Sequence, residues 1–353
     1  MKAVFKQFIF STLLFSSVFI ACNSGDNNKE VKNNEQENVQ VEAYPELQKQ
    51  ALNLFGILPS SAENPENPLT DEKIALGKKL YFDKILSKDN KQSCNTCHNV
   101  NTFGVDNKPL SEGNDGKLGD RNSPTTFNAA LHIAQFWDGR EPDVEAQAGG
   151  PILNPVEMAM PSEGEVIKRL EKVDQYVKMF KSAFPDDDSS ITYDNLKKAI
   201  GAYERKLITP SKFDDYLAGN AKALTDKEKE GLKTFISVGC ASCHNGALLG
   251  GNMFQKFGIF DDYWKLTKSK KIDSGKYVVT GVESDMFVFK VPSLRNIEKT
   301  YPYFHDGSVS DLGEAVKIMA KLELNKDLTD KDVNSIVTFL KTLTADIPQE
   351  LKQ

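Results

Sequence analysis

The segments Cys94-Asn95-Thr96-Cys97-His98 and Cys240-Ala241-Ser242-Cys243-His244 both follow the pattern Cys-x-x-Cys-His, and together they contain four of the five cysteines of the chain. This pattern is the attachment site of c-type haem. The two thiols form thioethers with the vinyl groups of the porphyrin, and the histidine ligates the iron. Two intervening residues allow both sulfurs to reach one porphyrin edge. The sequence therefore predicts two covalently bound haems c.

Two other interpretations of these cysteines fit less well. A zinc site that shares four cysteines usually has its two pairs roughly 15–20 residues apart, whereas the pairs here begin at residues 94 and 240. A thioredoxin-like Cys-x-x-Cys motif does not require a histidine directly after each pair. The histidines therefore favour haem.

The fifth cysteine, Cys22, follows an N-terminal segment typical of an export signal. Lys2 and Lys6 precede an uncharged, apolar run from residue 7 to residue 21 that is too short for a comfortable membrane span. Its end, Phe19-Ile20-Ala21-Cys22, resembles a bacterial lipobox, which predicts an export signal over 1–21 and lipidation of Cys22. An ordinary cleaved signal with an incidental cysteine is the alternative. Residues 22–44 are rich in Asn, Glu and Lys and are expected to form a flexible tether.

The remaining chain is long enough for two domains. Acidic residues outnumber basic ones by 50 to 44, which argues against nucleic acid as a partner. No other segment is apolar enough to span a membrane, so we expect membrane contact only through the N-terminal lipid.

The residues before the two haem motifs resemble each other, which indicates an internal duplication. Thr70 and Thr225 are suited to cap a helix, and each is followed by acidic residues, then by Gly77 or Gly231, with an aromatic residue four positions later. A glycine inside a helix costs about 1 kcal/mol relative to alanine, so its recurrence predicts a close helix crossing. Such a crossing beside the haem is the pattern of cytochrome c domains. We therefore expect haem domains over 45–208 and 209–345, with a tail, 346–353, that packs back on the first.

Hydrophobic periodicity predicts further helices. Their expected ranges are 163–184, 193–207, 312–322 and 332–343. Long loops rich in Gly, Asn and Pro lie between them, notably 99–124 and 247–292, and no run shows convincing strand alternation. The predicted fold class is mostly α, with two cytochrome c-like haem domains, long loops, and haems near the domain interface.

Four further stretches extend the comparison beyond the haem motifs. They are Arg121-Asn122-Ser123-Pro124-Thr125, Ala134-Gln135-Phe136-Trp137-Asp138-Gly139-Arg140, Phe289-Lys290-Val291-Pro292-Ser293-Leu294-Arg295-Asn296 and Tyr301-Pro302-Tyr303-Phe304-His305-Asp306-Gly307. Together with the haem motifs they resemble the bacterial dihaem cytochrome c peroxidases, a family that also contains the methylamine-utilisation tryptophan-modifying enzymes. The resemblance covers roughly residues 45–350.

The resemblance implies different roles for the two haems. The haem on His98 would reduce hydrogen peroxide, and the haem on His244 would receive electrons from a small c-type cytochrome or a cupredoxin. Met319 matches the second axial ligand of the electron-entry haem, where methionine raises the potential and saturates the iron. From the residues alone, Met253 and Met286 would also be candidates.

The resemblance also implies residues for chemistry and coupling. Glu157 matches a distal glutamate that moves protons during cleavage of the O–O bond, and Gln147 matches its polar companion. Trp137 matches a tryptophan between the two haems that would couple the irons. The match to a calcium site between the domains falls on the side chain of Asn122 and on the main-chain oxygens of Thr300 and Pro302, which are hard ligands suited to calcium.

One departure from the family concerns the peroxidatic haem. Many members carry a histidine before Arg121 that caps this iron in the oxidised enzyme, and here that place falls on Asn114. The segment 108–120 contains no histidine, so we expect an open iron site. His305 is interpreted as a structural or supporting residue, and His132 as a packing residue.

Three functions fit the sequence. The first is a hydrogen-peroxide reductase, lipid-anchored in the periplasm. The second is a high-valent dihaem oxidase of a protein or organic substrate. In that branch the second haem carries a tyrosine ligand, so Met319 argues against it. The third is a non-catalytic dihaem electron carrier, in which Glu157 and Gln147 would have no role. The resemblance is also compatible with a homodimer.

Overall fold

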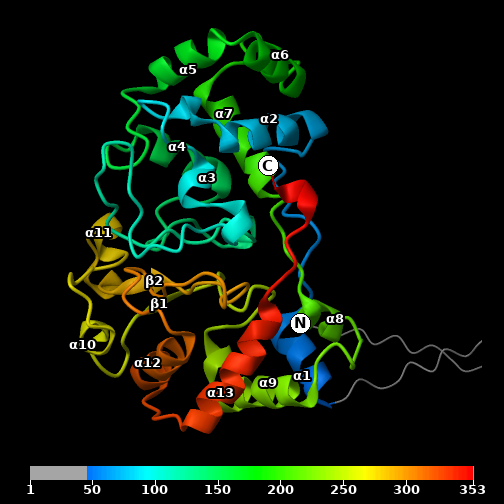
Figure 1. Cartoon of the computed structure of the whole chain (residues 1–353), viewed down its shortest axis with the longest axis vertical. Helices are drawn as coiled ribbons and strands as arrows, with labels where there is room; N and C mark the ends of the chain where they lie inside the picture. Colours follow the sequence, from blue (N-terminus) through cyan, green and yellow to red (C-terminus); the bar gives the residue numbers. More distant parts are fainter. Residues whose placement is uncertain (1–45, 353) are drawn as a thin grey trace, which may run out of the picture. The chain divides into compact units, whose positions relative to one another are not determined.

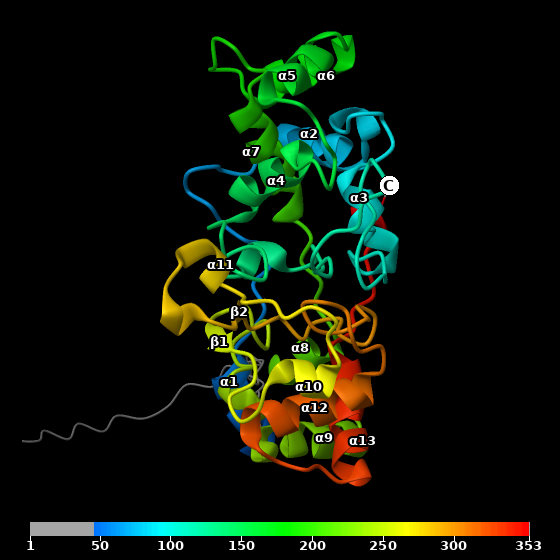
Figure 2. The same ribbon diagram turned by 90° about the vertical axis from the view of Figure 1, so that its left-hand side faces the viewer.

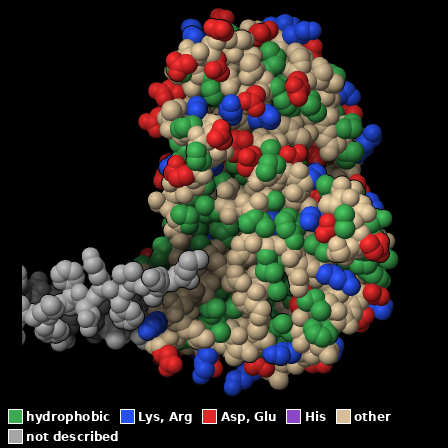
Figure 3. All heavy atoms as spheres, turned by 180° about the vertical axis from the view of Figure 1, so that it is seen from behind, with side chains coloured by type: hydrophobic (Ala, Val, Ile, Leu, Met, Phe, Trp, Pro, Cys, Tyr) green, Lys and Arg blue, Asp and Glu red, His purple; other side chains and the backbone are tan. Residues whose placement is uncertain are grey.

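The computed structural model describes residues 46–352. The predicted export signal, the predicted lipidation site Cys22 and the predicted tether lie outside these residues. Within 46–352 the chain is mostly helical, in agreement with the expected class. None of the helices in this range is both long and apolar enough to cross a bilayer. On the face shown in Figure 3, acidic and basic side chains are interspersed.

One group of helices surrounds a core formed largely by residues 76–207. Its α-helices are α2 (Asp71–Phe82), α3 (Cys94–Cys97), α4 (Val144–Leu153), α5 (Glu163–Glu171), α6 (Asp174–Ala183) and α7 (Tyr193–Glu204). Helix α2 packs mainly on α7, and α7 also contacts α4 (Figure 1). The first haem motif forms α3, and Cys94 packs against this core.

A second group surrounds another core, which contains Phe213, Phe235 and Phe339. Its α-helices are α1 (Glu46–Phe55), α8 (Lys212–Leu217), α9 (Asp226–Val238), α12 (Leu312–Leu324) and α13 (Asp330–Leu340). Helix α9 packs on α13, and Cys240 of the second haem motif lies against this core. Ala51 and Phe55 of α1 are also buried here. The sequence, by contrast, predicts that residues 45–208, which include α1, belong to the first haem domain.

The two helix crossings explain the repeated glycine. A Cβ atom on Gly77 of α2 would lie 1.8 Å from the main-chain oxygen of Ala199 in α7. A Cβ atom on Gly231 of α9 would lie 2.1 Å from the main-chain oxygen of Ser335 in α13. Only glycine allows either backbone contact, which confirms the predicted close crossing in both halves.

The expected helix over 163–184 is in fact two helices. Helix α5 ends at Glu171, Val173 is extended, and α6 begins at Asp174. The bend allows both Leu170 and Tyr176 to be buried, and the Tyr176 hydroxyl donates to the Asp83 carboxylate at 2.7 Å. Tertiary contacts therefore override a continuous helical period.

The long segment 247–292 contains more structure than its composition suggested. Strands β1 (Phe254–Lys256) and β2 (Val288–Lys290) pair antiparallel, with Gln255 opposite Phe289. Helices α10 (Tyr263–Thr267) and α11 (Tyr277–Thr280) lie between them in sequence (Figure 2). Strands of three residues are too short to show alternation, so the sequence missed them. The 3-10 helices of the described chain span Lys84–Leu86, Val100–Thr102, Ala129–Leu131, Cys240–Ser242, Glu283–Asp285, Lys341–Leu343 and Gln349–Leu351.

The C-terminal segment remains in the second core as far as Leu343 and then leaves it. Leu351 is buried in the first core, and Ile347 packs against that core. The Tyr203 hydroxyl donates to the main-chain oxygen of Leu351 at 2.8 Å, and Lys78 donates to that of Glu350 at 2.8 Å.

Candidate functional site

Both haem-motif histidines are held by the same kind of hydrogen bond. Nδ1 of His98 lies 3.0 Å from the main-chain oxygen of Pro124, and Nδ1 of His244 lies 3.0 Å from that of Leu249. A carbonyl oxygen can only accept, so Nδ1 carries the proton and Nε2 has its lone pair available. Burial lowers the pKa of both imidazoles, which keeps them neutral. This is the arrangement that orients a histidine for a metal, so both sites fit haem iron.

The cysteines also fit haem better than zinc. The two pairs lie against different cores, so the four thiols do not form one site. Burial raises the pKa of Cys97 and that of Cys240 to about 11 each. Before attachment, these environments favour neutral thiols, the form that precedes the thioether bond.

A large cavity adjoins the second motif. It encloses about 1590 Å³ of space, counting the part open to solvent, and Cys240, Cys243 and His244 line it. Most of the other side chains in its wall are apolar, which suits the faces of a porphyrin. Trp137 and the segment Ser123–Thr125 line it as well. The cavity therefore includes residues that precede the second haem domain in sequence.

Met319 lies in the wall of this cavity together with His244. It belongs to α12, where its neighbours Ile318 and Leu322 are buried in an aromatic and aliphatic cluster that fixes the helix. Met253 and Met286 do not line the cavity. Of the three candidate methionines, Met319 alone is in the same cavity as His244.

Glu157 lies in the turn after α4. Asn154 donates from Nδ2 to Oε1 of Glu157 at 3.0 Å, which leaves Oε2 without a partner in the described chain. Burial raises the pKa of Glu157, and the opposing influence of Arg140 and Asn154 does not cancel this effect. The charge of Glu157 is near enough to Cys97 to contribute, after burial and Asp106, to the raised pKa of that thiol. Glu157 therefore lies near the first haem motif.

Gln147 and Asn114 differ in how their side chains are used. Gln147 is a half-buried residue of α4, and its side-chain amide has no hydrogen-bond partner in residues 46–352. Asn114 is buried, and its amide donates to both Asp89 and Asp115 while its Oδ1 accepts from the Asp89 amide. The Asn114 side chain is thus fully occupied by Asp115 of its own loop and by Asp89 of the loop that precedes α3.

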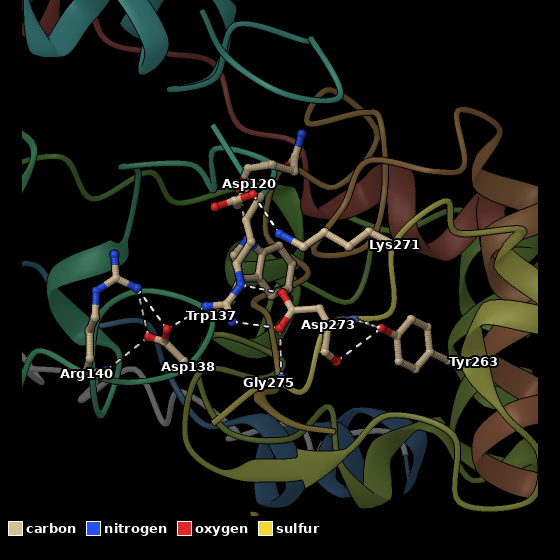
Figure 4. Close-up of polar contacts among 10 residues, drawn as sticks. Asp120, Trp137, Asp138, Arg140, Tyr263, Lys271, Asp273 and Gly275 are labelled. Carbon is tan, nitrogen blue, oxygen red and sulfur yellow. Dashed lines mark hydrogen bonds and ion pairs between the residues drawn. The ribbon is translucent and has the colours of Figure 1, made fainter. Parts of the chain in front are cut away.

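Trp137 lies at a junction of charged side chains (Figure 4). Its Nε1 donates to the main-chain oxygen of Asn122 at 2.9 Å, and its ring meets the His305 ring edge-on with centroids 6.5 Å apart. Arg121 forms ion pairs with Asp138 at 2.5 Å and with Asp273 at 2.6 Å. These bonds connect segments far apart in the sequence and fix the backbone on both sides of the indole.

Three further residues that could bind a metal ion through oxygen atoms line the same cavity. Asn122, Thr300 and Pro302 all line it. The main-chain oxygens of Thr300 and Pro302 accept no backbone hydrogen bond within the described chain, and neither does Asn122 Oδ1. The side-chain nitrogen of Asn122 donates to the main-chain oxygen of Lys108 at 2.8 Å. Uncommitted amide and carbonyl oxygens are suitable ligands for calcium.

Three polar residues in the wall of the cavity have surroundings that the sequence does not predict: Lys290, Glu323 and His132. His132 is more than a packing residue, because its Nδ1 lies 2.9 Å from Nζ of the buried Lys290. Glu323, one turn after Met319, also lines the cavity, and burial raises its pKa to about 7. His305 is buried among aromatic rings and stacks on Phe289 with centroids 4.4 Å apart. In the sequence, Lys290 lies between the apolar residues Phe289 and Val291, and this position predicts burial of the aliphatic part of its side chain.

Comparison with known proteins agrees with this site. A family model described as di-haem cytochrome c peroxidase matches residues 71–222. The chain is 45% identical over 308 residues to cytochrome c551 peroxidase of Pseudomonas aeruginosa, a match covering 86% of this chain and 88% of that protein. It is 45% identical over 294 residues to cytochrome c551 peroxidase of Nitrosomonas europaea, covering 83% and 85%. Identity to the methylamine utilization protein MauG of Methylorubrum extorquens is 32% over 301 residues, covering 82% and 83%.

Among solved structures, the chain is similar to a MauG-like protein associated with microbial copper homeostasis. The TM-score is 0.74 at 27% identity, and the match covers 84% of this chain and 96% of that one. The diheme peroxidase BthA from Burkholderia thailandensis, at 19% identity and a TM-score of 0.66, shares the fold. Two haem-attachment motifs with oriented histidines, and close relatives aligned over most of their length, lead to one conclusion: the chain belongs to the dihaem cytochrome c peroxidase family.

Proposed function

We propose that this protein reduces hydrogen peroxide to water with electrons from a small c-type cytochrome or cupredoxin. The observation that carries the proposal is the unlike surroundings of two alike haem motifs. The His244 motif shares a cavity with a methionine, whereas the His98 motif lies near the half-buried carboxyl group of Glu157, whose pKa is raised. The first environment suits electron transfer and the second suits proton transfer to a bound substrate.

The haem on His244 would be the electron-entry group, with Met319 as its second axial ligand. Methionine opposite histidine raises the potential and leaves no position for peroxide. The assignment is supported by the shared cavity of Met319 and His244, and by the position of Met253 and Met286 outside it.

The haem on His98 would supply the iron that binds peroxide and the electrons that cleave the O–O bond. Reduction of one peroxide to two waters takes two electrons and two protons. Glu157 would accept a proton from one peroxide oxygen at Oε2 and deliver it to the other oxygen. Asn154 holds Oε1 and so directs Oε2 to this task. Gln147, whose amide is uncommitted, would hydrogen-bond the bound peroxide.

Trp137 would couple the two haems. This role is supported by its place in the wall of the cavity beside His244 and by the rigid frame of Arg121, Asp138 and Asp273 around it. We also propose calcium bound by the Asn122 side chain and the main-chain oxygens of Thr300 and Pro302. Because Asn122 O also accepts from Trp137 Nε1, the ion would help to fix the indole.

The domain assignment follows the two cores. We propose an N-terminal peroxidatic haem domain over about 56–208, to which the tail 346–353 returns, and a C-terminal electron-transfer haem domain over 209–345 that also includes α1. The burial of α1 in the second core and of Leu351 in the first supports these limits. We propose a periplasmic location with a lipid anchor at Cys22, supported by the export-signal pattern and by haem attachment outside the cytoplasm.

Oxidation of a protein or organic substrate is the less favoured alternative. Identity to MauG proteins is 32%, against 45% to the cytochrome c551 peroxidases. Met319 in the cavity, where that branch has a tyrosine, also favours peroxide reduction. A purely electron-carrying role gives Glu157 and Gln147 no function.

The test is peroxide turnover by the purified holoprotein, with a reduced small c-type cytochrome as donor. We expect oxidation of two cytochromes for each peroxide consumed, with both haems present by mass. Holoprotein that consumes no peroxide with several reduced cytochromes and cupredoxins would contradict the proposal.

A further inference from the structure

Lys290, the last residue of β2, is a buried lysine with an unusual partner. Its side chain is 5% exposed. Nζ donates to the main-chain oxygen of Ala134 at 2.7 Å and lies 2.9 Å from Nδ1 of His132. An ammonium group has three donors and no acceptor. When Lys290 is protonated, Nδ1 of His132 therefore accepts, and the ring carries its proton on Nε2.

In this tautomer, one N–H donor of His132 and one of Lys290 have no acceptor within residues 46–352. Nε2 of His132 is buried and has no hydrogen-bond partner in the described chain. Two of the three Lys290 donors are used, and Lys290 forms no ion pair with a carboxylate of residues 46–352. Burial of a cation without an anion is costly, and it lowers the pKa of Lys290 to about 7. An anion beside the pair would supply an acceptor for both free donors and would stabilise the charged form of Lys290.

The nearby charged groups of the protein do not provide that anion. Asp138 raises the pKa of Lys290 by attraction, but its carboxylate is already bound by Arg121 and Arg140. The His132 ring is held in place, because a Cβ atom on Gly251 would lie 2.6 Å from its Cδ2. Lys290 and His132 both line the cavity that contains Cys240, Cys243 and His244.

We propose that Lys290 and the Nε2–H group of His132 form an anion-binding pair that holds a carboxylate of the porphyrin attached at Cys240 and Cys243. The inference rests on haem attachment there, which is part of the proposed function. The porphyrin carries two carboxylates, and a porphyrin attached at Cys240 and Cys243 would occupy the cavity that Lys290 and His132 line. A free anion from solution could bind the same pair. The experiment below distinguishes a free anion from the porphyrin carboxylate.

This pair would affect the electron-entry potential. A positive charge beside the haem favours the reduced state, which carries one more electron. The Lys290 amide also donates to the main-chain oxygen of Trp137 at 2.8 Å. One residue would therefore both set the potential of the His244 haem and hold the backbone of Trp137.

The test is a redox titration of the dihaem holoprotein with Lys290→Met, which keeps the length of the side chain and removes its charge. We expect the reduced-to-oxidised ratio of the His244 haem at a fixed potential to fall about tenfold, a shift of about 59 mV, with the His98 haem little changed. His132→Asn keeps an acceptor for Lys290 and removes the Nε2–H donor, and it should give a smaller shift of the same sign. Lys331→Met, at an exposed lysine of α13, is the matched control.

Two results would overturn the proposal. One is an unchanged potential of the His244 haem in both Lys290→Met and His132→Asn while both haems are attached. The other is a potential of the parent protein that follows added chloride or phosphate, which would identify a free anion in place of the porphyrin carboxylate. Neither result depends on peroxide turnover, so a failure of the proposed function is seen separately.

Discussion

The two haem motifs share their attachment chemistry and differ in what surrounds them. Each lies beside a helix crossing that depends on glycine, and each histidine donates from Nδ1 to a carbonyl oxygen. Around His244 the cavity offers the thioether of Met319, the cation of Lys290 and many aromatic rings. Near His98 lies Glu157, a carboxyl group with one committed oxygen and one uncommitted oxygen.

This difference indicates how a duplicated unit can acquire two roles. The repeated part is the scaffold, because attaching a haem places the same demands on both halves. In the proposed function, the divergent part would be the side chain presented to the far face of the iron. A soft ligand there favours electron transfer, whereas a proton-transfer group beside an open iron favours peroxide chemistry.

The largest expected effect comes from removal of the carboxylate near His98. Glu157→Gln should lower peroxide turnover by about a hundredfold or more, as is usual for loss of an acid–base group, without changing the spectra of either haem. Steady-state kinetics with a reduced cytochrome measures the loss. Glu171→Gln, at an exposed carboxylate of α5, is the control. Near-normal turnover of Glu157→Gln would remove this residue from the mechanism.

The same carboxylate should control the pH dependence. Burial raises the pKa of Glu157 above the ordinary value of 4.5. Glu157 must be ionised to accept the first proton, so turnover should fall as the pH drops through this raised pKa. Because Arg140 lowers that pKa, Arg140→Gln should move the acid limb of the pH–rate profile to higher pH. An acid limb at the same pH in both proteins would show that another group titrates.

The second effect concerns the His244 half. Met319→His should lower the potential of that haem and slow turnover, because histidine stabilises the oxidised iron more than methionine does. Peroxide binding at the His98 haem should be unchanged. Met286→His, outside the cavity, should leave the potentials as they are. A redox titration of the parent protein with two equal low potentials would contradict the assignment.

A third comparison tests the shared scaffold. Gly77→Ala and Gly231→Ala should each destabilise the protein by about 1–3 kcal/mol or more, because the added methyl group meets a main-chain oxygen in both crossings. Thermal unfolding of the holoprotein measures the effect. Gly164→Ala in α5 has no close neighbour and should be neutral or stabilising by up to about 1 kcal/mol. Equal stability of all three variants would mean that the crossings relax.

The last prediction concerns the resting state of the His98 haem. With Asn114 in place of a capping histidine, the oxidised protein should contain a five-coordinate or water-bound haem. It should react with peroxide without prior reduction. Electron paramagnetic resonance and stopped-flow mixing measure the two properties. Two low-spin haems, with a lag that only a reductant relieves, would instead identify another residue as the cap.

Most of the features of the fold that could be predicted from the sequence depend on local patterns of residues. The haem motifs, the helix-capping threonines and the paired glycines act through neighbours in sequence or through a helical period, and the structure agrees with each of them. The break between α5 and α6, the β1–β2 pair and the position of α1 were not predicted. They depend on contacts between distant residues, such as the bond from Tyr176 to Asp83 and the burial of Phe55 beside Phe213 and Phe235.

For the candidate site the division is similar. The sequence by itself determined the number of haems and their attaching residues, because thioether formation and iron ligation require fixed side chains at fixed spacing. The residues alone did not separate Met319 from Met253 and Met286, although the family resemblance favoured Met319, and they offered no reason to pair Lys290 with His132. Only the tertiary structure shows that Met319 shares a cavity with His244 and that Lys290 contacts His132, since a cavity is formed by segments far apart in the chain. The tautomer of His132 likewise depends on a lysine 158 residues away.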